Sequence, residues 1–417
     1  MKHAPTALLI AAFVQSAWCD SVVATTAEVE LSTVTISEDI VATEETAIAP
    51  EPAALAMLAP PRALPLDDGS ADSAVAYPGP AEVPPPAPND ACRQALQGTC
   101  CPQWPHFFVF DALLLQRDNS ASNAAIAVGS SVSPDPGATL LTARDMQFPV
   151  AGGTRLLYGH RGGNDVGWEI GYLGVYGMSA NADVAGPNAE SVPGDLGQNI
   201  PGWSTAEFVG GGYQSMLNIA EANVFLYDCC MDRDPCAACA CKRQCNCRCT
   251  DLLAGFFWAG LEESAALGVV CCPGDPATFY TVNTSSNLFG GQLGIRRRRD
   301  WHRWAVEGTA KAGLAGTTLA QSSGPITATL APGVVFREPT SASTTGVGFL
   351  STLNLTAIYR ISDHWGLRAG YNLIWLSGVA LAPNQWDFTD TDASGTGIRG
   401  GSGLFLHGVN VGAERRW

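Results

Sequence analysis

Apolar and polar residues alternate along several segments in the second half of this chain. In residues 302–318, Trp304, Val306 and Leu314 fall on one face of an extended segment, and Glu307 falls on the other. Successive side chains of a β-strand point to opposite faces, so this alternation predicts strands with one apolar and one polar face. The segments that follow alternate in the same way.

From residue 106 onwards the chain divides into segments separated by polar stretches rich in Gly, Ser, Pro and Asp. Tilted transmembrane strands need roughly 9–11 residues, and the segments are close to that length or longer. We therefore expect an all-β fold, an antiparallel up-and-down transmembrane β-barrel of about ten strands, with twelve as the alternative. The expected strands cover residues 106–117, 154–161, 166–180, 213–227, 251–263, 287–297, 302–318, 347–361, 364–379 and 403–417.

The expected connections alternate between short and long. Segments 347–361 and 364–379 are joined by a very short turn, whereas the next connection runs over residues 380–402. Outer-membrane barrels have short periplasmic turns and longer external loops. Counting strands back from Trp417 therefore predicts that the C-terminus and the segment before residue 106 both lie on the periplasmic side.

The N-terminus has the pattern of a secretory signal peptide, which we expect to cover residues 1–19. Lys2 and His3 precede an apolar run over residues 7–14, and small and polar residues follow. Beyond that run, the sequence has no stretch of about 18 apolar residues, so it offers no candidate for a transmembrane helix.

Residues 20–105 have a different composition, rich in Ala, Pro, Thr and acidic residues. Residues 20–91 hold 13 acidic residues and one base, Arg62, and so carry −12 of the formal net charge of −16. Such a segment cannot bury enough apolar surface to offset the entropy of ordering, so we expect a disordered acidic linker in the periplasm. Its charge excludes a nucleic-acid partner, because phosphate binding needs clustered Lys and Arg. The run of four arginines from Arg296 to Arg299 is interpreted as a charged turn at a membrane surface.

Polar residues on the inward faces of the last strands are the candidate site. They carry both charges and would face a narrow lumen, where they would either form a plugging network or line a small polar pore. The candidates are Glu307, Lys311, Asn354, Arg360, Arg368, Asn372, Glu414 and Arg416.

A cysteine-rich insert is expected over residues 228–250, on the periplasmic side. In an oxidising compartment its thiols are expected to form disulfides, although the C-x-C and C-x-x-C spacings would also suit a soft metal ion. The chain has 14 cysteines, and eight of them lie in this insert. These are Cys229, Cys230, Cys236, Cys239, Cys241, Cys245, Cys247 and Cys249.

No arrangement of residues indicates catalysis. The histidines after the signal peptide have no Ser or Cys motif of the nucleophile-elbow or C-x-H type around them, and the glycine runs do not join a strand to a helix as a phosphate loop does. We therefore expect neither an enzyme nor a bound cofactor.

The strands resemble those of the planctomycete outer-membrane β-barrel family BBP7, a family of beta-barrel porins. The resemblance covers about residues 106–417, and the order of its motifs is preserved. They are FDALLL (110–115), DLLAGF (251–256), NLFGGQLG (287–294), EGTAKAGL (307–314), YRI (359–361), RAGY (368–371) and the ending 406–417. These motifs are structural, so the resemblance implies a barrel in the outer membrane rather than an activity.

We therefore expect an outer-membrane porin or structural envelope component that gives passive passage to small solutes at most. Its partners would be outer-membrane lipid and the barrel-assembly machinery, which reads a terminal aromatic such as Trp417. One alternative is a non-conducting anchor that binds envelope partners through the linker or the cysteine-rich insert. Another is a barrel hydrolase, for which the sequence nominates no residues.

Overall fold

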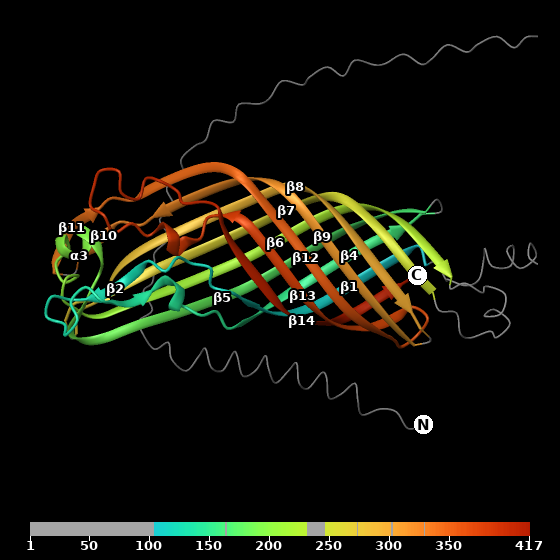
Figure 1. Ribbon diagram of the computed structural model, residues 1–417, viewed down its shortest axis with the longest axis horizontal. Helices are drawn as coiled ribbons and strands as arrows, with labels where there is room; N and C mark the ends of the chain where they lie inside the picture. The colour runs from blue at the N-terminus through green and yellow to red at the C-terminus, as the bar shows by residue number, and fades with distance from the viewer. Residues whose placement is uncertain (1–103, 163–164, 232–246, 273, 302, 329) are drawn as a thin grey trace, which may run out of the picture. The chain divides into compact units, whose positions relative to one another are not determined.

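The computed structural model describes residues 104–162, 165–231, 247–272, 274–301, 303–328 and 330–417. In this part of the chain ten antiparallel strands close into a barrel (Figure 1). They are β1 (His106–Arg117), β4 (Val150–Arg161), β5 (Val166–Ser191), β6 (Ala206–Met231), β7 (Cys247–Val270), β8 (Thr278–Asp300), β9 (Trp304–Ser323), β12 (Thr340–Arg360), β13 (Trp365–Val379) and β14 (Ser402–Arg416).

Each strand pairs with the strand that precedes or follows it around the barrel, and β14 closes the sheet on β1. This closing pair runs in unbroken register from Phe107 opposite Arg416 to Arg117 opposite Leu406. Closure leaves no edge on the barrel wall, so backbone groups along it are paired between strands. The prediction of an all-β, ten-stranded antiparallel barrel is confirmed. Two short strands, β2 (Ala125–Gly129) and β3 (Thr139–Thr142), join the same sheet beside β5 without widening the barrel.

The two ends of the barrel differ in the length of their connections. One end, here called the turn end, holds the short connections from β4 to β5, from β8 to β9 and from β12 to β13, together with the paired ends of the barrel, His106 and Trp417. The opposite end, the loop end, holds every long connection that the structure describes (Figure 1). Its short elements are β2, β3, η1 (Ala143–Asp145), α3 (Gly194–Asn199), β10 (Ile326–Ala328), β11 (Ala331–Arg337) and η2 (Ala382–Gln385).

Six neighbouring strands are much longer than a bilayer crossing requires. Strands β5 and β6 each have 26 residues, and β12 still has 21. A crossing needs roughly 9–11 residues, so this side of the wall continues well past an apolar belt towards the loop end. The strands predicted from the sequence were too short on this side. The residues that extend them towards the loop end are mostly small and polar on the outward face, a pattern that is typical of loops.

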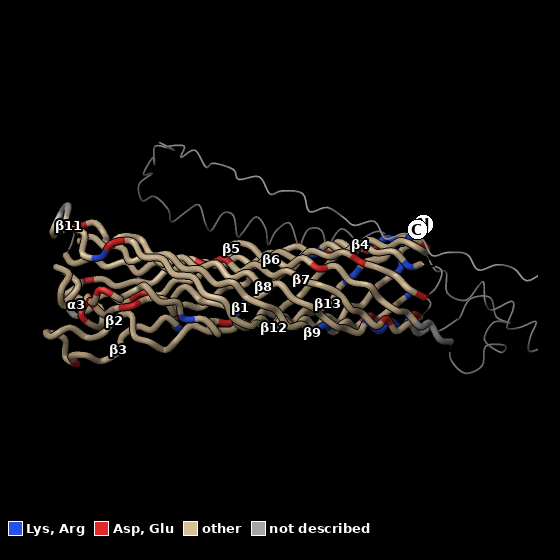
Figure 2. The backbone as a smooth tube through the Cα atoms, turned by 90° about the horizontal axis from the view of Figure 1, so that it is seen from above, with Lys and Arg blue, Asp and Glu red and all other residues tan. Residues whose placement is uncertain are grey.

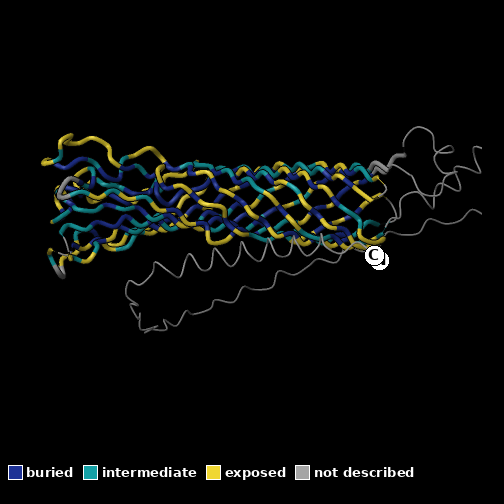
Figure 3. Tube along the Cα trace, turned by 90° about the horizontal axis from the view of Figure 1, so that it is seen from below, coloured by how far each residue is buried: buried dark blue, intermediate teal, exposed yellow. Residues whose placement is uncertain are grey.

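The outer face carries a belt of exposed apolar side chains. Burial alternates along the strands: in β1 every second side chain from Phe107 to Arg117 is buried, and the side chains between them are exposed (Figure 3). On the outward positions Phe256, Leu314 and Val347 are 77%, 67% and 76% exposed. A water-soluble protein seldom leaves so large an apolar area uncovered.

The run of four arginines is part of β8 and not a turn, so that interpretation was wrong. Arg296 and Arg298 point into the barrel and are buried, whereas Arg297 lies outside and is exposed. A one-residue step along a strand reverses the direction of the side chain, which is why neighbouring arginines meet opposite surroundings.

The signal peptide 1–19 and the linker up to residue 103 lie outside the described residues. None of the helices that the structure describes is long and apolar enough to cross a bilayer. The strands β6 and β7 extend into the predicted insert, where their last pair is Met231 opposite Cys247. The described ends of the insert are therefore continuations of the barrel wall.

Candidate functional site in the barrel interior

Charged side chains from all ten strands meet inside the half of the barrel next to the turn end, where many charged positions gather in Figure 2. We call this set of ion-paired side chains the charge network. Its carboxylates are Asp111, Glu169, Glu221, Asp251, Asp300, Glu307 and Glu414. Its cations are Arg155, Arg161, Arg296, Arg298, Lys311, Arg360, Arg368 and Arg416.

Glu414 is the most connected carboxylate of the charge network. Its oxygens lie 3.0 Å from Arg298 Nη2, 2.8 Å from Arg368 Nη1 and 3.2 Å from Arg416 Nε. Arg298 and Arg368 also reach Glu307, at 3.4 and 3.3 Å. Strands β8, β9, β13 and β14 are thus joined across the lumen as well as around the wall.

A second part of the network joins strands β4, β5, β7 and β8. Asp251 on β7 lies 2.9 Å from Arg161 Nη2 and 3.6 Å from Arg296 Nη1, and Arg296 also pairs with Glu169 on β5. Next to it, Lys311 on β9 pairs with Glu221 on β6. Each charge has a partner at close range, which offsets the cost of removing it from water.

The amide side chains form a layer beside the charges. Asn354 Nδ2 donates to Asn372 Oδ1 at 2.8 Å, and Asn372 Nδ2 donates to Asn410 Oδ1 at 2.9 Å. Across the barrel, Gln292 Nε2 donates to Asn223 Oδ1 at 2.7 Å. The residues proposed from the sequence are therefore placed in two layers. Glu307, Lys311, Arg360, Arg368, Glu414 and Arg416 belong to the charge network, and Asn354 and Asn372 belong to the amide layer.

Beyond the amide layer towards the loop end, the lumen is filled by apolar side chains. Leu115, Leu288 and Leu406 have no exposed area, and Ile374 and Leu404 retain 1%. They belong to one core cluster that includes residues from every barrel strand. Packing of this kind fills a narrow barrel with side chains instead of leaving a channel.

Arg117 and Glu263 form a second buried ionic site above the apolar layer, close to the loop end. Arg117 Nη1 lies 2.6 Å from Glu263 Oε1, and Arg117 Nη2 donates to Tyr213 Oη at 2.6 Å. Tyr213 in turn donates to Glu263 Oε2 at 2.8 Å. The guanidinium also lies over the Phe148 ring, 4.7 Å from its centroid, a cation–π geometry.

The connection over residues 380–401 folds inwards onto this site. The backbone N–H of Ala382 donates to Glu263 Oε2 at 3.0 Å, and that of Ala380 donates to Ser286 Oγ at 3.1 Å. Leu381 has no exposed area, and Trp386 retains 4%. This segment, which we call the inner loop, covers the lumen from the loop end.

Asp387 fixes the outer part of the inner loop. Burial alone would raise the pKa of this carboxyl group, but the hydroxyl and backbone N–H of Thr389 and the backbone N–H of Gly395 donate to it, and Arg337 lies nearby. The result is a pKa below the ordinary Asp value. The carboxylate is therefore the form that holds the loop.

The sequence predictions missed nine of the fifteen residues of the charge network and the pair Arg117–Glu263. Asp111, Glu169, Asp251 and the pair Arg117–Glu263 all lie on early strands, where apolar residues on both faces hide the alternation. A signal existed on β1, because Val109, Asp111, Leu113, Leu115 and Arg117 share one parity. A charged residue at an otherwise apolar inward position marks a partner elsewhere in the barrel.

The space left in the lumen is small. A cavity of about 70 Å³ lies between the charge network and the apolar layer, beside Arg155, Glu221 and Asn372. It has room for a few water molecules. Chemically, this part of the interior can hold charge and water.

Four cysteines of the predicted cluster, Cys236, Cys239, Cys241 and Cys245, lie outside the described residues, and only the backbone is described for Cys229, Cys230 and Cys247. Cys249 is disulfide-bonded, while the pairing of the other cluster cysteines stays a prediction, as does their metal-binding alternative. Cys271 and Cys272 lie at the loop end as free thiols. Burial and the neighbouring Cys272 thiol raise the pKa of Cys271 to about 11.

Known proteins resemble this chain in different degrees. No curated protein matches the sequence. Among solved structures, the outer membrane protease OmpT from Escherichia coli is 8% identical with a TM-score of 0.43, covering 75% of this chain and 97% of its own. The Pseudomonas putida toluene transporter TodX is 10% identical with a TM-score of 0.17, covering 76% and 91%. A Pseudomonas aeruginosa FadL homologue is 8% identical with a TM-score of 0.18, covering 75% and 90%.

These scores carry no argument about activity. The family comparison is more specific, and it covers the later part of the barrel rather than the whole stretch from residue 106. The resemblance predicted from the sequence is confirmed there: residues 230–417 match the family model Putative beta barrel porin-7 (BBP7).

Proposed function

We propose that the protein is an outer-membrane barrel with a closed lumen, a structural component of the envelope that carries its N-terminal segment and its cysteine-rich insert in the periplasm. The observation that carries the proposal is the continuous filling of the lumen by the charge network, the amide layer, the apolar layer and the inner loop.

The outer surface supports insertion into a bilayer. On β7 the outward residues Leu252, Phe256 and Trp258 are apolar, and Thr250 and Glu262 flank them. The span between the polar flanks is about ten residues, which suits a tilted crossing of the hydrocarbon core. The closed sheet satisfies its own backbone hydrogen bonds, as a structure in lipid must.

The asymmetry of the barrel supports the orientation. Short turns face the periplasm in outer-membrane barrels, so the turn end would lie on the periplasmic side. Trp417, the end of β6 and the start of β7 would lie on that side too. The terminal aromatic Trp417 stacks on His106, with ring centroids 5.7 Å apart, and is 39% exposed. It is available to the assembly machinery at that end.

Closure distinguishes this proposal from an open porin. A pore needs a water-filled path lined by polar groups, whereas here the inward charges neutralise one another and an apolar layer separates them from the loop end. The ion pairs join side chains from strands on different sides of the wall. A channel through the lumen could therefore open only if these buried salt bridges were broken.

The experiment is a pair of measurements on the folded, full-length mature protein. A slower-migrating form after boiling and a β-rich circular dichroism spectrum would establish the folded barrel. Planar-bilayer recordings of that preparation are expected to show no stable single-channel steps. Regular conductance steps from folded protein would overturn the closed lumen, and helical dichroism would overturn the barrel.

A further inference from the structure

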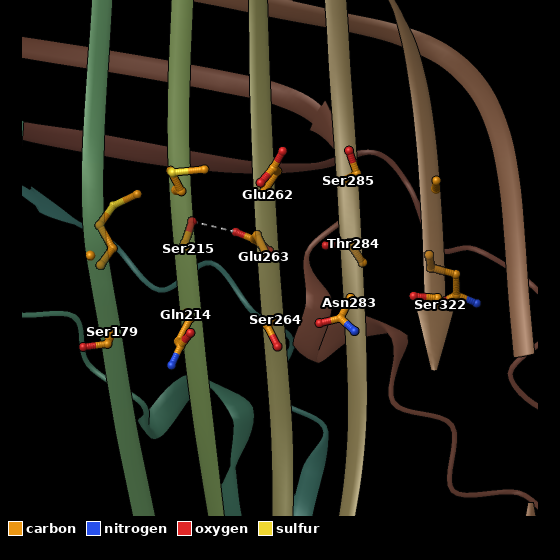
Figure 4. Close-up of a pocket in the computed structure, with 15 residues that line it drawn as sticks. Ser179, Gln214, Ser215, Glu262, Glu263, Ser264, Asn283, Thr284, Ser285 and Ser322 are labelled. Atoms are coloured by element: carbon orange, nitrogen blue, oxygen red, sulfur yellow. Dashed lines mark hydrogen bonds between the residues drawn. The ribbon is translucent and has the colours of Figure 1, made fainter. Parts of the chain in front are cut away.

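A polar hollow of about 750 Å³ lies on the outer face of strands β5 to β9, beyond the apolar belt (Figure 4). One outward row crosses all five strands in register, from Ser179 through Gln214, Ser264 and Asn283 to Ser322. The next row towards the belt is Met216, Glu262, Ser285 and Ala320. The hollow thus presents hydroxyl, amide and carboxylate groups on short side chains.

An apolar hollow of about 660 Å³ lies on β7, β8, β9 and β12, within the belt. Its rows are Phe256, Gly291, Leu314 and Phe349, followed by Ala254, Leu293 and Ala312. A side chain at Gly291 would meet only one backbone oxygen, at 3.9 Å, so the floor of this hollow is open.

The two hollows share strands β7, β8 and β9, and a row of aromatic side chains separates them. Trp258 stands opposite Phe289, and Phe289 stands opposite Gly316. A side chain at Gly316 would meet nothing within 4 Å. Trp258 Nε1 donates to Asn287 Oδ1 at 3.1 Å, on the polar side of this row. An indole with an apolar body and a bound N–H marks the boundary between hydrocarbon and headgroup.

The spacing fits one elongated molecule. Six residues along β7 separate Phe256 in the apolar hollow from Glu262 in the polar one, about 20 Å along the strand and about 14 Å in depth at a tilt near 45°. An acyl chain in the first hollow would place its headgroup beside the second, past the open space at Gly316.

The charges select the headgroup. No Lys or Arg occurs among the residues that line either hollow, all of which the structure describes, and Glu262 is the exposed charge of the polar hollow. A phosphate would meet a carboxylate and no cation, whereas sugar hydroxyls can both donate to Glu262 and exchange hydrogen bonds with Gln214 and Asn283.

We propose that the two hollows together bind a glycolipid of the outer leaflet, with an acyl chain in the apolar hollow and an uncharged sugar headgroup in the polar hollow. This inference rests on the proposed orientation, in which the loop end faces outwards. A lipid with an anionic phosphate headgroup is the competing occupant, and the test separates the two.

The test uses the folded full-length protein in phosphatidylcholine nanodiscs that contain equal amounts of monoglucosyl diacylglycerol and phosphatidylglycerol with matched chains. Native mass spectrometry of the released protein reports which lipid is retained. We expect the glucolipid to be retained about 5-fold over phosphatidylglycerol, equivalent to about one net hydrogen bond. Equal retention, or preference for phosphatidylglycerol, would overturn the proposal.

Two variants and one control sharpen the result. Ala320→Trp fills the polar hollow and is expected to abolish the preference, whereas Ala185→Trp, on an exposed outward position of β5 outside both hollows, is expected to keep it. Glu262→Lys is expected to reverse it towards phosphatidylglycerol. Loss of preference in both tryptophan variants would contradict the assigned site. Failure of the barrel to insert into nanodiscs would instead contradict the proposed function.

Discussion

Arg117 on β1 and Glu263 on β7 face each other across the barrel at 2.6 Å, with no exposed area on either side chain. The two strands are not neighbours in the sheet. Their contact therefore joins opposite parts of the wall through the lumen, and Glu263 adds the backbone of the inner loop to the same site.

Breaking this pair on one side should destabilise the barrel strongly. Arg117→Met leaves a buried carboxylate without its cation, and the free energy of unfolding is expected to fall by about 3–5 kcal/mol. The double variant Arg117→Met/Glu263→Gln should recover part of that loss, since no uncompensated charge remains. Urea unfolding from lipid vesicles measures both free energies.

The exposed residue Arg144, changed to Met, is the matched control and should shift the free energy of unfolding by less than about 0.5 kcal/mol. Equal effects of Arg117→Met and the control would contradict the assignment.

Glu414 should be the most sensitive carboxylate of the charge network. Glu414→Gln removes the charge shared by Arg298, Arg368 and Arg416 and leaves three cations close together, so a loss of about 3–5 kcal/mol is expected. Arg415→Gln changes the adjacent residue, which points outwards and lies over the Trp365 and Trp417 rings, so the expected loss is only about 1 kcal/mol. The same unfolding assay decides between them. If the two variants unfold at one urea concentration, the network contributes little to stability.

The inner loop should loosen in acid because of Asp387. Its pKa in the folded protein lies below the ordinary value, so its contribution to stability is complete above about pH 4 to 5 and is lost as the pH falls through the folded pKa. Protease cleavage within residues 380–401 should therefore increase as the pH falls below about 4 in the wild type. Asp387→Asn should be cleaved faster at neutral pH and show less further change. Identical pH profiles would show that another group controls the loop.

Thiol labelling should separate the two ends of the barrel. An impermeant reductant and an impermeant maleimide added to intact cells are expected to reach Cys271 and Cys272 and to spare the insert over residues 228–250, whose disulfides should be reduced and labelled only after the outer membrane is opened. Labelling of Cys271 should be slow at neutral pH and faster at alkaline pH, because its pKa of about 11 keeps the thiolate scarce. Strong labelling of the insert in intact cells would reverse the proposed orientation.

The sequence was sufficient for the architecture because alternation, strand length and connection length all reflect constraints on a barrel in lipid. It identified Glu307, Arg368 and Glu414 because polar residues there oppose a clearly apolar face. It was insufficient where both faces of a strand are apolar, as around Asp111, and where small polar residues continue a strand beyond the belt, as at Ser264 and Asn283. Partners across a lumen, such as Arg117 and Glu263, depend on closure of the whole sheet, which no local pattern encodes.

The measurement that tests the closed lumen most directly is single-channel recording with the folded wild-type protein beside a variant in which residues 380–386 of the inner loop are replaced by a short Gly-Ser connection. We expect silent bilayers for the wild type, and silence or rare brief events for the variant, because the charge network and the apolar layer still fill the barrel. Stable, regular conductance steps from the wild type would contradict the closed lumen.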